Sequence, residues 1–431
     1  MNHVSSWGRL PTQDHQVVAL VNHPLRVLPM PAGHQGLAHG MGRSYGDVCL
    51  NPGGTLWTTT HQDRLVDWNP ATGLLTCEAG VLLRDIQRLF VPRGWTLPVL
   101  PGTQFVTVGG AIANDVHGKN QHVQGTFGDH VQSLRLLRTD GQLQDCGPDL
   151  EPERFAATVG GLGLTGVITH ATLALQRVHG LWLETEHIRF EGIGEFLSLA
   201  DASVHFWEHT VAWIDSLSGR SARGIFRRAN PASGERKAPP PHAPRRLPFH
   251  PPFSLVNRHT VRAFNAAHFH LNRRRAKRLV HRDAFFNPLD ACLDWNRLYG
   301  SAGFYQYQCV VPRQVAQDAL QAMLGDIRRG GEASCLSVLK TFGDRAPGGM
   351  LSFVQPGVTL ALDFPNRGAT TLTLFERLDA IVQQAGGRLY PAKDARMPRD
   401  LFEASYPLLP IFLRHRDPGI SSAFSRRTMG R

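Results

Sequence analysis

The chain has 431 residues, is 42% hydrophobic and carries a formal net charge of +11, so it is long enough for two globular domains and has ample apolar content for their cores. No stretch approaches the roughly 18 uninterrupted apolar residues of a membrane-spanning helix, and no apolar signal segment opens the sequence, so we expect a cytoplasmic protein. The six cysteines are scattered without a C-x-x-C pair, which argues against a disulfide framework and a thiolate zinc site and favours reduced, mostly buried thiols.

The first motif is a glycine-rich loop at residues 37–47. Gly40, Gly42 and Gly46 alternate there with Arg43 and Ser44, which supply a guanidinium and a hydroxyl. Such a loop has the flexibility and the donors to wrap a pyrophosphate. It lacks the strand-to-long-helix context and the later acidic residue of a Rossmann fingerprint.

The next elements alternate between strands and a helix. Residues 55–57 and 74–79 are typical of short strands, and the apolar spacing of residues 82–90 predicts an amphipathic helix ending near Gly94. This alternation indicates an α+β domain.

The central stretch, residues 98–120, is the densest in glycine. It contains Gly102, Gly109, Gly110 and Gly118 among small and β-branched residues. Glycines allow the backbone to lie directly against a flat or phosphorylated ligand, although a Gly-Gly pair is also typical of an ordinary tight turn. His117 and Lys119 add a donor and a cation, as an anionic or redox cofactor would need.

A hairpin and a third glycine cluster follow. Residues 131–138 alternate as in a strand, with a turn at Asp140-Gly141. Residues 158–168 contain glycines on an apolar background, and packing of a strand against a helix explains Gly163 and Gly166 equally well.

The positive charge is concentrated in residues 220–282, where about sixteen Lys and Arg face Glu235 alone. Within this segment the proline-rich residues 237–252 predict an extended, mobile loop, and residues 273–278 predict a basic run at a helix end. The alternatives are a solvated surface and attraction to anionic lipid or a phosphate-bearing substrate. Aromatic residues are too sparsely interleaved to favour nucleic acid.

In this order and spacing the motifs resemble the vanillyl-alcohol-oxidase, or PCMH-type, family of FAD-linked oxidoreductases, and within it the oxidases of polyprenylphosphoryl ribose. The resemblance covers nearly the whole chain. It rests on residues 42–47, 100–103, 106–113, 117–120, 163–166, 303–308 and 389–394.

The resemblance implies an α+β fold with three parts. Residues 1–180 would form the two-lobed PCMH-type FAD-binding domain. Residues 181–387 would form a substrate domain built on an antiparallel sheet with helices, and residues 388–431 would return to the FAD domain. Loss of glycine density after Gln176 and the turn at Gly386-Gly387 agree with these boundaries.

The resemblance also implies a cofactor site. FAD would be held by Gly40, Gly42, Arg43, Ser44, Tyr45, Gly46, Gly102, Thr107, Val108, Gly109, Gly110, Asn114, Val116, His117, Ile168 and Tyr390. Many relatives carry a histidine that bonds covalently to the flavin in the first loop. Tyr45 stands at that position here, so non-covalent FAD is expected.

The implied reaction is hydride removal from a secondary alcohol, the 2′-hydroxyl of a polyprenylphosphoryl pentose, to flavin N5. Lys393 would stabilise negative charge on the reduced flavin, with a salt bridge to Asp394 as the alternative. With Lys393, Tyr45 and His117 form the expected catalytic set. The substrate would be bound by Lys119, Gln306, Gln308, Lys340 and Lys393, and an exposed strand position is the alternative for Lys340.

The resemblance leaves alternatives open. The implied partners are a lipid-linked sugar, an NAD(P)H-dependent short-chain ketoreductase that completes epimerisation, and the inner face of a membrane. The other hypotheses are an aldonolactone or alditol oxidase and a basic binding protein without enzymatic activity. Ala361 replaces a cysteine expected beside the active site, so no reactive thiol should line the pocket, and Asn287 replaces an expected histidine.

Overall fold

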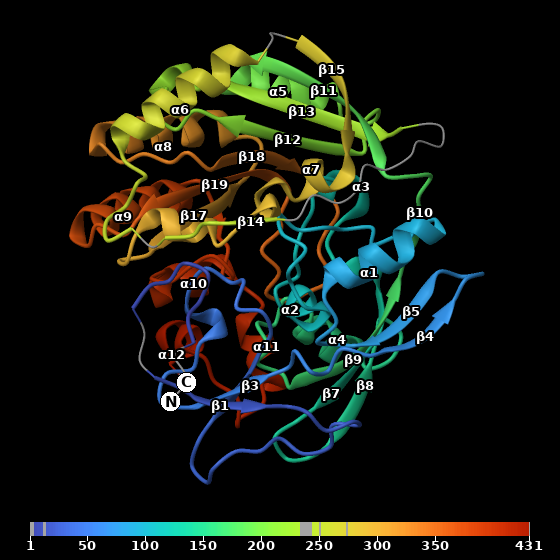
Figure 1. Cartoon of the computed structure of the whole chain (residues 1–431). Helices are drawn as coiled ribbons and strands as arrows, with labels where there is room; N and C mark the ends of the chain where they lie inside the picture. The colour runs from blue at the N-terminus through green and yellow to red at the C-terminus, as the bar shows by residue number, and fades with distance from the viewer. Residues whose placement is uncertain (1–3, 12–13, 233–243, 250, 273–274, 431) are drawn as a thin grey trace.

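The computed structural model describes residues 4–11, 14–232, 244–249, 251–272 and 275–430. Its strands form a small parallel sheet and two larger antiparallel sheets, and most of the helices pack against these (Figure 1). A mixed α+β fold with an antiparallel sheet in the second half of the chain is thereby confirmed.

The small sheet carries the first glycine-rich loop. Its order is β1-β3-β2, with β1 at Gln16–Ala19, β2 at Gly36–His39 and β3 at Thr55–Thr58. The predicted strand at residues 55–57 is thus confirmed. Because β2 ends at His39, the glycine-rich loop begins at the carboxyl end of a buried strand.

The five-stranded sheet carries the other glycine clusters. Its order is β4-β5-β9-β7-β8, formed by β4 (Leu65–Asn69), β5 (Leu74–Glu78), β7 (Val131–Leu137), β8 (Leu143–Cys146) and β9 (Val167–Ala174). The predicted strand at residues 74–79 and the hairpin at residues 140–141 are confirmed. β6 (Trp95–Thr96) and β10 (Gln176–Arg177) form a separate antiparallel pair.

Short helices follow in this half of the chain. α1 (Leu83–Phe90), α2 (Val108–Ala113) and α4 (Pro152–Thr158) pack with this sheet, whereas α3 (Gln121–Gln124) contacts β18 (Ser337–Phe342) of the large sheet described below. The predicted amphipathic helix is α1, which buries Leu83, Ile86 and Phe90, and the 3-10 turn after it ends at Gly94 in the left-handed conformation. The central glycine stretch also forms α2, a helix that its glycines did not predict.

The eight-stranded antiparallel sheet has the order β15-β11-β13-β12-β18-β19-β17-β20. Its strands are β11 (Trp182–Phe190), β12 (His209–Ile214), β13 (Gly224–Pro231), β15 (Arg275–His281), β17 (Phe304–Val311), β18 (Ser337–Phe342), β19 (Gly357–Pro365) and β20 (Arg388–Leu389). The helices α5 (Ile193–Asp201), α8 (Ala316–Gly330) and α9 (Ala369–Gln384) pack on it (Figure 1).

The strands of this sheet alternate in the direction of their side chains. On β19, Leu360 and Leu362 join the core with α8 and α9, whereas Thr359 and Ala361 face a cavity on the other side. One face of the sheet is therefore a hydrophobic core, and the other carries polar side chains.

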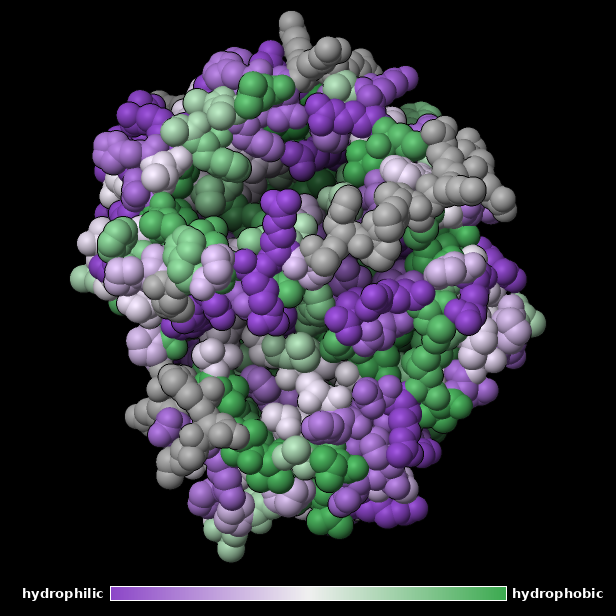
Figure 2. Space-filling model, viewed as in Figure 1, coloured by the Kyte–Doolittle hydropathy of each residue, from purple (hydrophilic) through white to green (hydrophobic). Residues whose placement is uncertain are grey.

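The basic segment differs in part from expectation. Residues 237–243 and 250 lie outside the described residues, and the two-residue strand β14 (Arg245–Arg246) pairs in parallel with β16 (Cys292–Leu293). The helix α6 (Arg258–Leu271) ends before the basic run. Residues 275–278 lie in β15 at the edge of the large sheet, so their placement at a helix end was wrong. Figure 2 shows hydrophilic and hydrophobic side chains mixed over α6 and β15, above a hollow with hydrophobic residues.

The C-terminal segment packs against the start of the chain. After β20 this segment forms α10 (Arg399–Ser405), α11 (Leu409–His415) and α12 (Ala423–Met429). The short helix α7 (Arg282–Phe286) lies earlier in the chain, between β15 and β16. Ser421 N–H donates to Gly36 O at 3.0 Å, and Arg427 pairs with Asp47 at 2.8 Å. The domain boundaries at residues 180 and 387 stay predictions. Among the described residues, no helix has both the length and the apolar character needed to cross a bilayer.

Candidate active site

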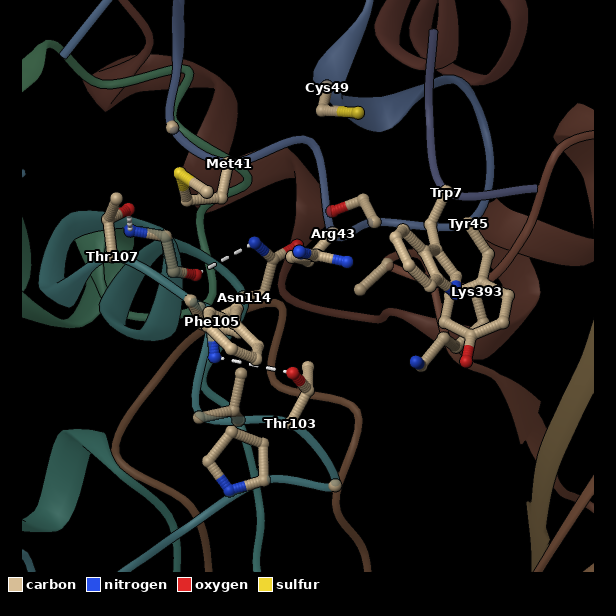
Figure 3. Close-up of a pocket in the computed structure, with 18 of the residues that line it drawn as sticks. Trp7, Met41, Arg43, Tyr45, Cys49, Thr103, Phe105, Thr107, Asn114 and Lys393 are labelled. Carbon is tan, nitrogen blue, oxygen red and sulfur yellow. Dashed lines mark hydrogen bonds between the residues drawn. The ribbon is translucent and has the colours of Figure 1, made fainter. Parts of the chain in front are cut away.

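One cavity of about 380 Å³ collects the glycine-rich segments and the polar face of the large sheet. Its wall is completed by the segment after α7 and by the turn that follows β20. Figure 3 shows Arg43 and Tyr45 from the first loop together with Thr107 and Asn114, the residues directly before and after α2, and Lys393 beside the Tyr45 ring.

Most residues predicted to hold the cofactor line this cavity. They are Gly40, Gly42, Arg43, Ser44, Tyr45, Gly102, Thr107, Gly109, Gly110, Asn114, Val116, His117, Ile168 and Tyr390. Gly46 and Val108 do not line it. Val108 is fully buried, and its N–H donates to Val81 O at 2.8 Å, so it anchors the start of α2 to the segment after β5.

Two glycines show different reasons for the absence of a side chain. A Cβ on Gly102 would meet no described atom within 4 Å, so this backbone faces open space in the cavity. A Cβ on Gly46 would stand 1.6 Å from the carbonyl oxygen of Asp394. Gly46 therefore permits close packing of the C-terminal segment, and its contact with the cofactor stays a prediction.

The first loop is held rigidly on both sides. Trp7 N–H donates to Ser44 O at 2.8 Å, and Tyr45 N–H donates to Ala392 O at 3.0 Å. The Arg43 guanidinium lies 4.1 Å from the centre of the Trp7 ring, and its Nε has no hydrogen-bond partner among the described residues. A fixed, unpaired guanidinium donor in a glycine-rich loop suits a pyrophosphate.

The α2 segment offers fewer free groups than its glycines suggest. The N–H groups of Gly109 and Gly110 already donate to Ala79 O at 2.8 Å and to Thr107 Oγ1 at 3.1 Å. Asn114 donates its amide to Gly110 O at 2.9 Å, and its Oδ1 is left without a partner among the described residues. The donors, unpaired acceptor and open backbone along this wall fit the FAD that the family resemblance implies.

The sheet side of the cavity carries the predicted substrate-binding residues, Lys119, Gln306, Gln308, Lys340 and Lys393, and all five line it. Lys119 Nζ donates to the carbonyl oxygens of Phe285 and, at 3.0 Å, Phe286, whereas Lys340 Nζ donates to Gly118 O at 3.1 Å. The alternative of an exposed strand position for Lys340 is therefore wrong.

The lysines lie close enough to repel one another. Burial, followed by repulsion from Lys340, lowers the pKa of Lys119 to about 7. Burial, followed by repulsion from Lys393, lowers the pKa of Lys340 to about 7. A wall of half-buried ammonium groups without direct ion pairs among the described residues favours an anionic ligand.

Lys393 lies over an aromatic ring. Its Nζ is 3.7 Å from the centre of the Tyr45 ring, and burial lowers its pKa while the charge of Asp363 opposes that shift. Asp394 instead pairs with Arg427 at 3.0 Å. The alternative salt bridge between Lys393 and Asp394 is absent from the described structure.

His117 is buried between this cationic wall and a cluster of aromatic rings. Its Nε2 lies 3.2 Å from Gln308 Nε2, and its Nδ1 has no partner among the described residues. Burial, and then the charges of Lys340 and Lys393, hold the pKa of His117 well below its ordinary value. The imidazole is therefore neutral, with one ring nitrogen available.

Several residues of the site were not predicted from the sequence, because they stand outside its motifs. Trp7 and Phe105 flank Arg43, and Asp363 lies beside Gln306. Cys49 and Cys292 line the cavity, whereas the expectation concerned only a reactive thiol. For Cys49 the expected lack of reactivity still follows, because burial raises the pKa of its thiol to about 12.

Comparison with known proteins gives matches along almost the whole chain. Residues 15–147 match the FAD binding domain family. The chain is 35% identical to the decaprenylphosphoryl-β-D-ribose oxidase of Mycolicibacterium smegmatis, over 95% of this chain and 92% of that protein. It is 34% identical to an uncharacterized protein of Streptomyces coelicolor over 77% of this chain and 94% of that protein. A D-arabinono-1,4-lactone oxidase of Yarrowia lipolytica is 28% identical over 36% of this chain and 32% of its own length.

Proposed function

The chain belongs to the family of FAD-linked oxidoreductases that includes decaprenylphosphoryl-β-D-ribose oxidase, and from this premise we propose that it oxidises the 2′-hydroxyl of a polyprenylphosphoryl pentose to a ketone. The observation that carries the proposal is the wall formed by Lys119, Lys340 and Lys393. Half-buried ammonium groups without direct ion pairs among the described residues are costly, and a phosphate ligand offsets that cost.

Bound FAD supplies the hydride acceptor, at flavin N5, for such an oxidation. The glycine-rich loop with Arg43 and Ser44 would hold the pyrophosphate, and Gly102, Asn114, His117 and the α2 wall would hold the flavin. Tyr45 stands where relatives carry the histidine that bonds to the flavin, so the FAD would be non-covalent. Acid precipitation of the protein should then leave all flavin absorbance in the supernatant, whereas a yellow pellet would contradict this.

The polar side chains of the sheet would each bind a different part of the substrate. Lys119 and Lys340 would bind the phosphate, while Gln306 and Gln308 would orient the sugar hydroxyls through their paired donors and acceptors. Neutral His117 and Tyr45 would position the reacting carbon. Lys393 would supply the fixed positive charge where negative charge develops.

Anaerobic bleaching of the flavin absorbance tests the proposal. Purified holoprotein is mixed with a short-chain polyprenylphosphoryl ribose, an aldonolactone or an alditol. The proposal predicts rapid bleaching by the phosphorylated lipid sugar and none by the other two. Bleaching by the lactone or alditol alone would support the second hypothesis, although an uncharged sugar leaves the lysine wall without a counter-ion. The hypothesis of a binding protein without enzymatic activity is set aside because of the family membership.

The surface beside the cavity suits a membrane that holds such a substrate. β14 pairs with β16, whose residues line the cavity, and its Arg245 and Arg246 are exposed. Phe249 and Phe253, in the same stretch, are 52% and 69% exposed. Cations next to exposed aromatic side chains are typical of proteins that dock on anionic bilayers.

Sedimentation with vesicles tests the membrane contact. The protein should bind vesicles containing phosphatidylglycerol and not neutral ones, and Phe249→Asp with Phe253→Asp should abolish binding. Phe206→Asp is the control, because Phe206 is 75% exposed but precedes β12 and lies outside this stretch. Equal binding by the double variant would contradict the contact.

A ketone product also requires a reductase to complete an epimerisation, and we propose an NAD(P)H-dependent short-chain ketoreductase as that partner.

A further inference from the structure

Asp363 is a buried carboxyl directly behind the cavity wall. It lies on β19, on the same face as Thr359 and Ala361, which line the cavity, and its exposed fraction is 0%. Gln306 is its register partner on β17 and donates its amide to Asp363 Oδ1 at 2.5 Å. Asp363 Oδ2 makes no hydrogen bond to any described residue.

Among the described residues, Lys393 is the cation that acts on Asp363. Four titratable groups feel the charge of Asp363: Tyr45 from the glycine-rich loop, Tyr299 before β17, Cys335 before β18, and Lys393 after β20. Three of them are neutral acids. Burial raises the pKa of Asp363, and the positive charge of Lys393 opposes that rise. The two groups form no direct ion pair in the described structure, so their charges act on each other through space.

Lys393 needs such an anion. Its ring partner Tyr45 is uncharged, and the nearby charge of Lys340 repels it. Without a nearby negative charge, a buried ammonium group loses its proton at neutral pH. A neutral amine would provide no fixed positive charge.

We propose that Asp363 is a positioning residue that keeps Lys393 in its charged form and fixes the amide of Gln306. The amide N–H goes to the carboxylate, which leaves the amide oxygen for a hydroxyl group of the substrate. The inference rests on the proposed function, because it assigns Asp363 to the same site. Asp363 would thus act on the site although it does not line the cavity and would not touch the substrate.

The variant Asp363→Asn separates charge from shape. Asparagine has nearly the same volume and keeps an acceptor oxygen for Gln306, but it removes the negative charge. Asp417→Asn is the matched control. Asp417, in the C-terminal segment, is also buried, with 1% of its surface exposed, and it accepts hydrogen bonds from Thr139 and Gly419.

The readout is the acylation of Lys393 by acetic anhydride in the holoprotein, followed by peptide mass spectrometry across a pH series. Only the neutral amine reacts, so the midpoint of the profile reports its protonation. We expect the midpoint to fall by about one pH unit or more in Asp363→Asn and to stay unchanged in Asp417→Asn. An unchanged midpoint in Asp363→Asn overturns the inference.

This readout requires no substrate, so it can fail or succeed independently of the bleaching experiment. Should Asp363→Asn not fold, Lys393→Met tests the same coupling from the other side. Loss of the ammonium group should increase the infrared carbonyl band of a protonated buried carboxyl at neutral pH, and an unchanged band overturns the inference. In Asp363→Asn the alkaline limb of the rate of flavin bleaching should move down by the same interval as the acylation midpoint.

Discussion

Replacement of Lys393 by methionine should slow flavin reduction without loss of the fold. Methionine fills a similar volume and keeps the unbranched stem, but it removes the ammonium group that lies 3.7 Å from the centre of the Tyr45 ring. Lys393 lines the cavity and has no direct ion pair in the described structure, so no neighbouring anion neutralises its charge at contact.

The expected fall in the rate of flavin reduction follows from the loss of one unit charge at the site. A unit charge at about 4 Å from a developing charge contributes about 4 kcal/mol at an effective dielectric constant of about 20. Loss of one preorganised electrostatic partner typically lowers kcat by about 10²–10³. We therefore expect the first-order rate of flavin reduction to fall by about 10²–10³, while the thermal unfolding midpoint stays equal to or above that of the unaltered protein.

The assay is rapid anaerobic mixing with a short-chain polyprenylphosphoryl ribose, with the rate normalised to bound FAD. Lys277→Met is the control, because Lys277 is an exposed lysine on β15. A reduction rate within about fivefold of the unaltered protein would refute the role of Lys393, and so would a loss explained entirely by lower FAD content.

Further predictions concern the other lysines and two glycines. Lys340→Met should raise the thermal midpoint, because it removes a buried cation whose pKa burial lowers to about 7, and should raise KM for the phosphorylated substrate by about 10- to 100-fold with little change in kcat; a lower midpoint would contradict this. Lys119 and Lys340 have a pKa of about 7 when folded and 10.5 as the ordinary value, so the unfolded chain binds more protons between these pH values. The free energy of unfolding contributed by these groups therefore rises with pH across that window, and urea titrations at pH 7 and pH 9 measure it. Gly102→Ala should keep the fold but retain less FAD, whereas Gly46→Ala, whose Cβ would stand 1.6 Å from Asp394 O, should unfold at a markedly lower temperature; equal stability of the two variants would contradict the packing argument.

Local patterns were sufficient to predict several elements of the fold. The apolar spacing of α1 predicted the helix, and the glycine after it predicted where the helix ends. The hairpin after β7 was predicted by alternating apolar and polar residues followed by an Asp-Gly turn. The helix α2 could not be predicted, because glycine disfavours helices and α2 is stabilised by the Thr107 cap and contacts to distant strands. The strand at residues 275–278 escaped prediction because pairing with β11, about ninety residues earlier, decides it.

The site was predictable where motifs are contiguous and hidden where it depends on distant contacts. The glycine-rich loops could be expected to border one ligand, and they do line one cavity. Trp7 stands in an N-terminal segment without a motif, and backbone bonds of this segment to Ser44 and Tyr45 bring it to the loop. Asp363 looked like an ordinary strand residue, since its meaning depends on Gln306 across β17 and on Lys393 after β20.

The most direct test of the proposed function locates the bond that breaks. Short-chain polyprenylphosphoryl ribose deuterated at C2 is mixed anaerobically with the holoprotein, and the rate of flavin bleaching is compared with that of the protiated substrate and of a substrate deuterated at C3. The account predicts bleaching that slows several-fold with deuterium at C2 and is unaffected by deuterium at C3. Absence of bleaching, or an isotope effect at C3 alone, would contradict oxidation of the 2′-hydroxyl.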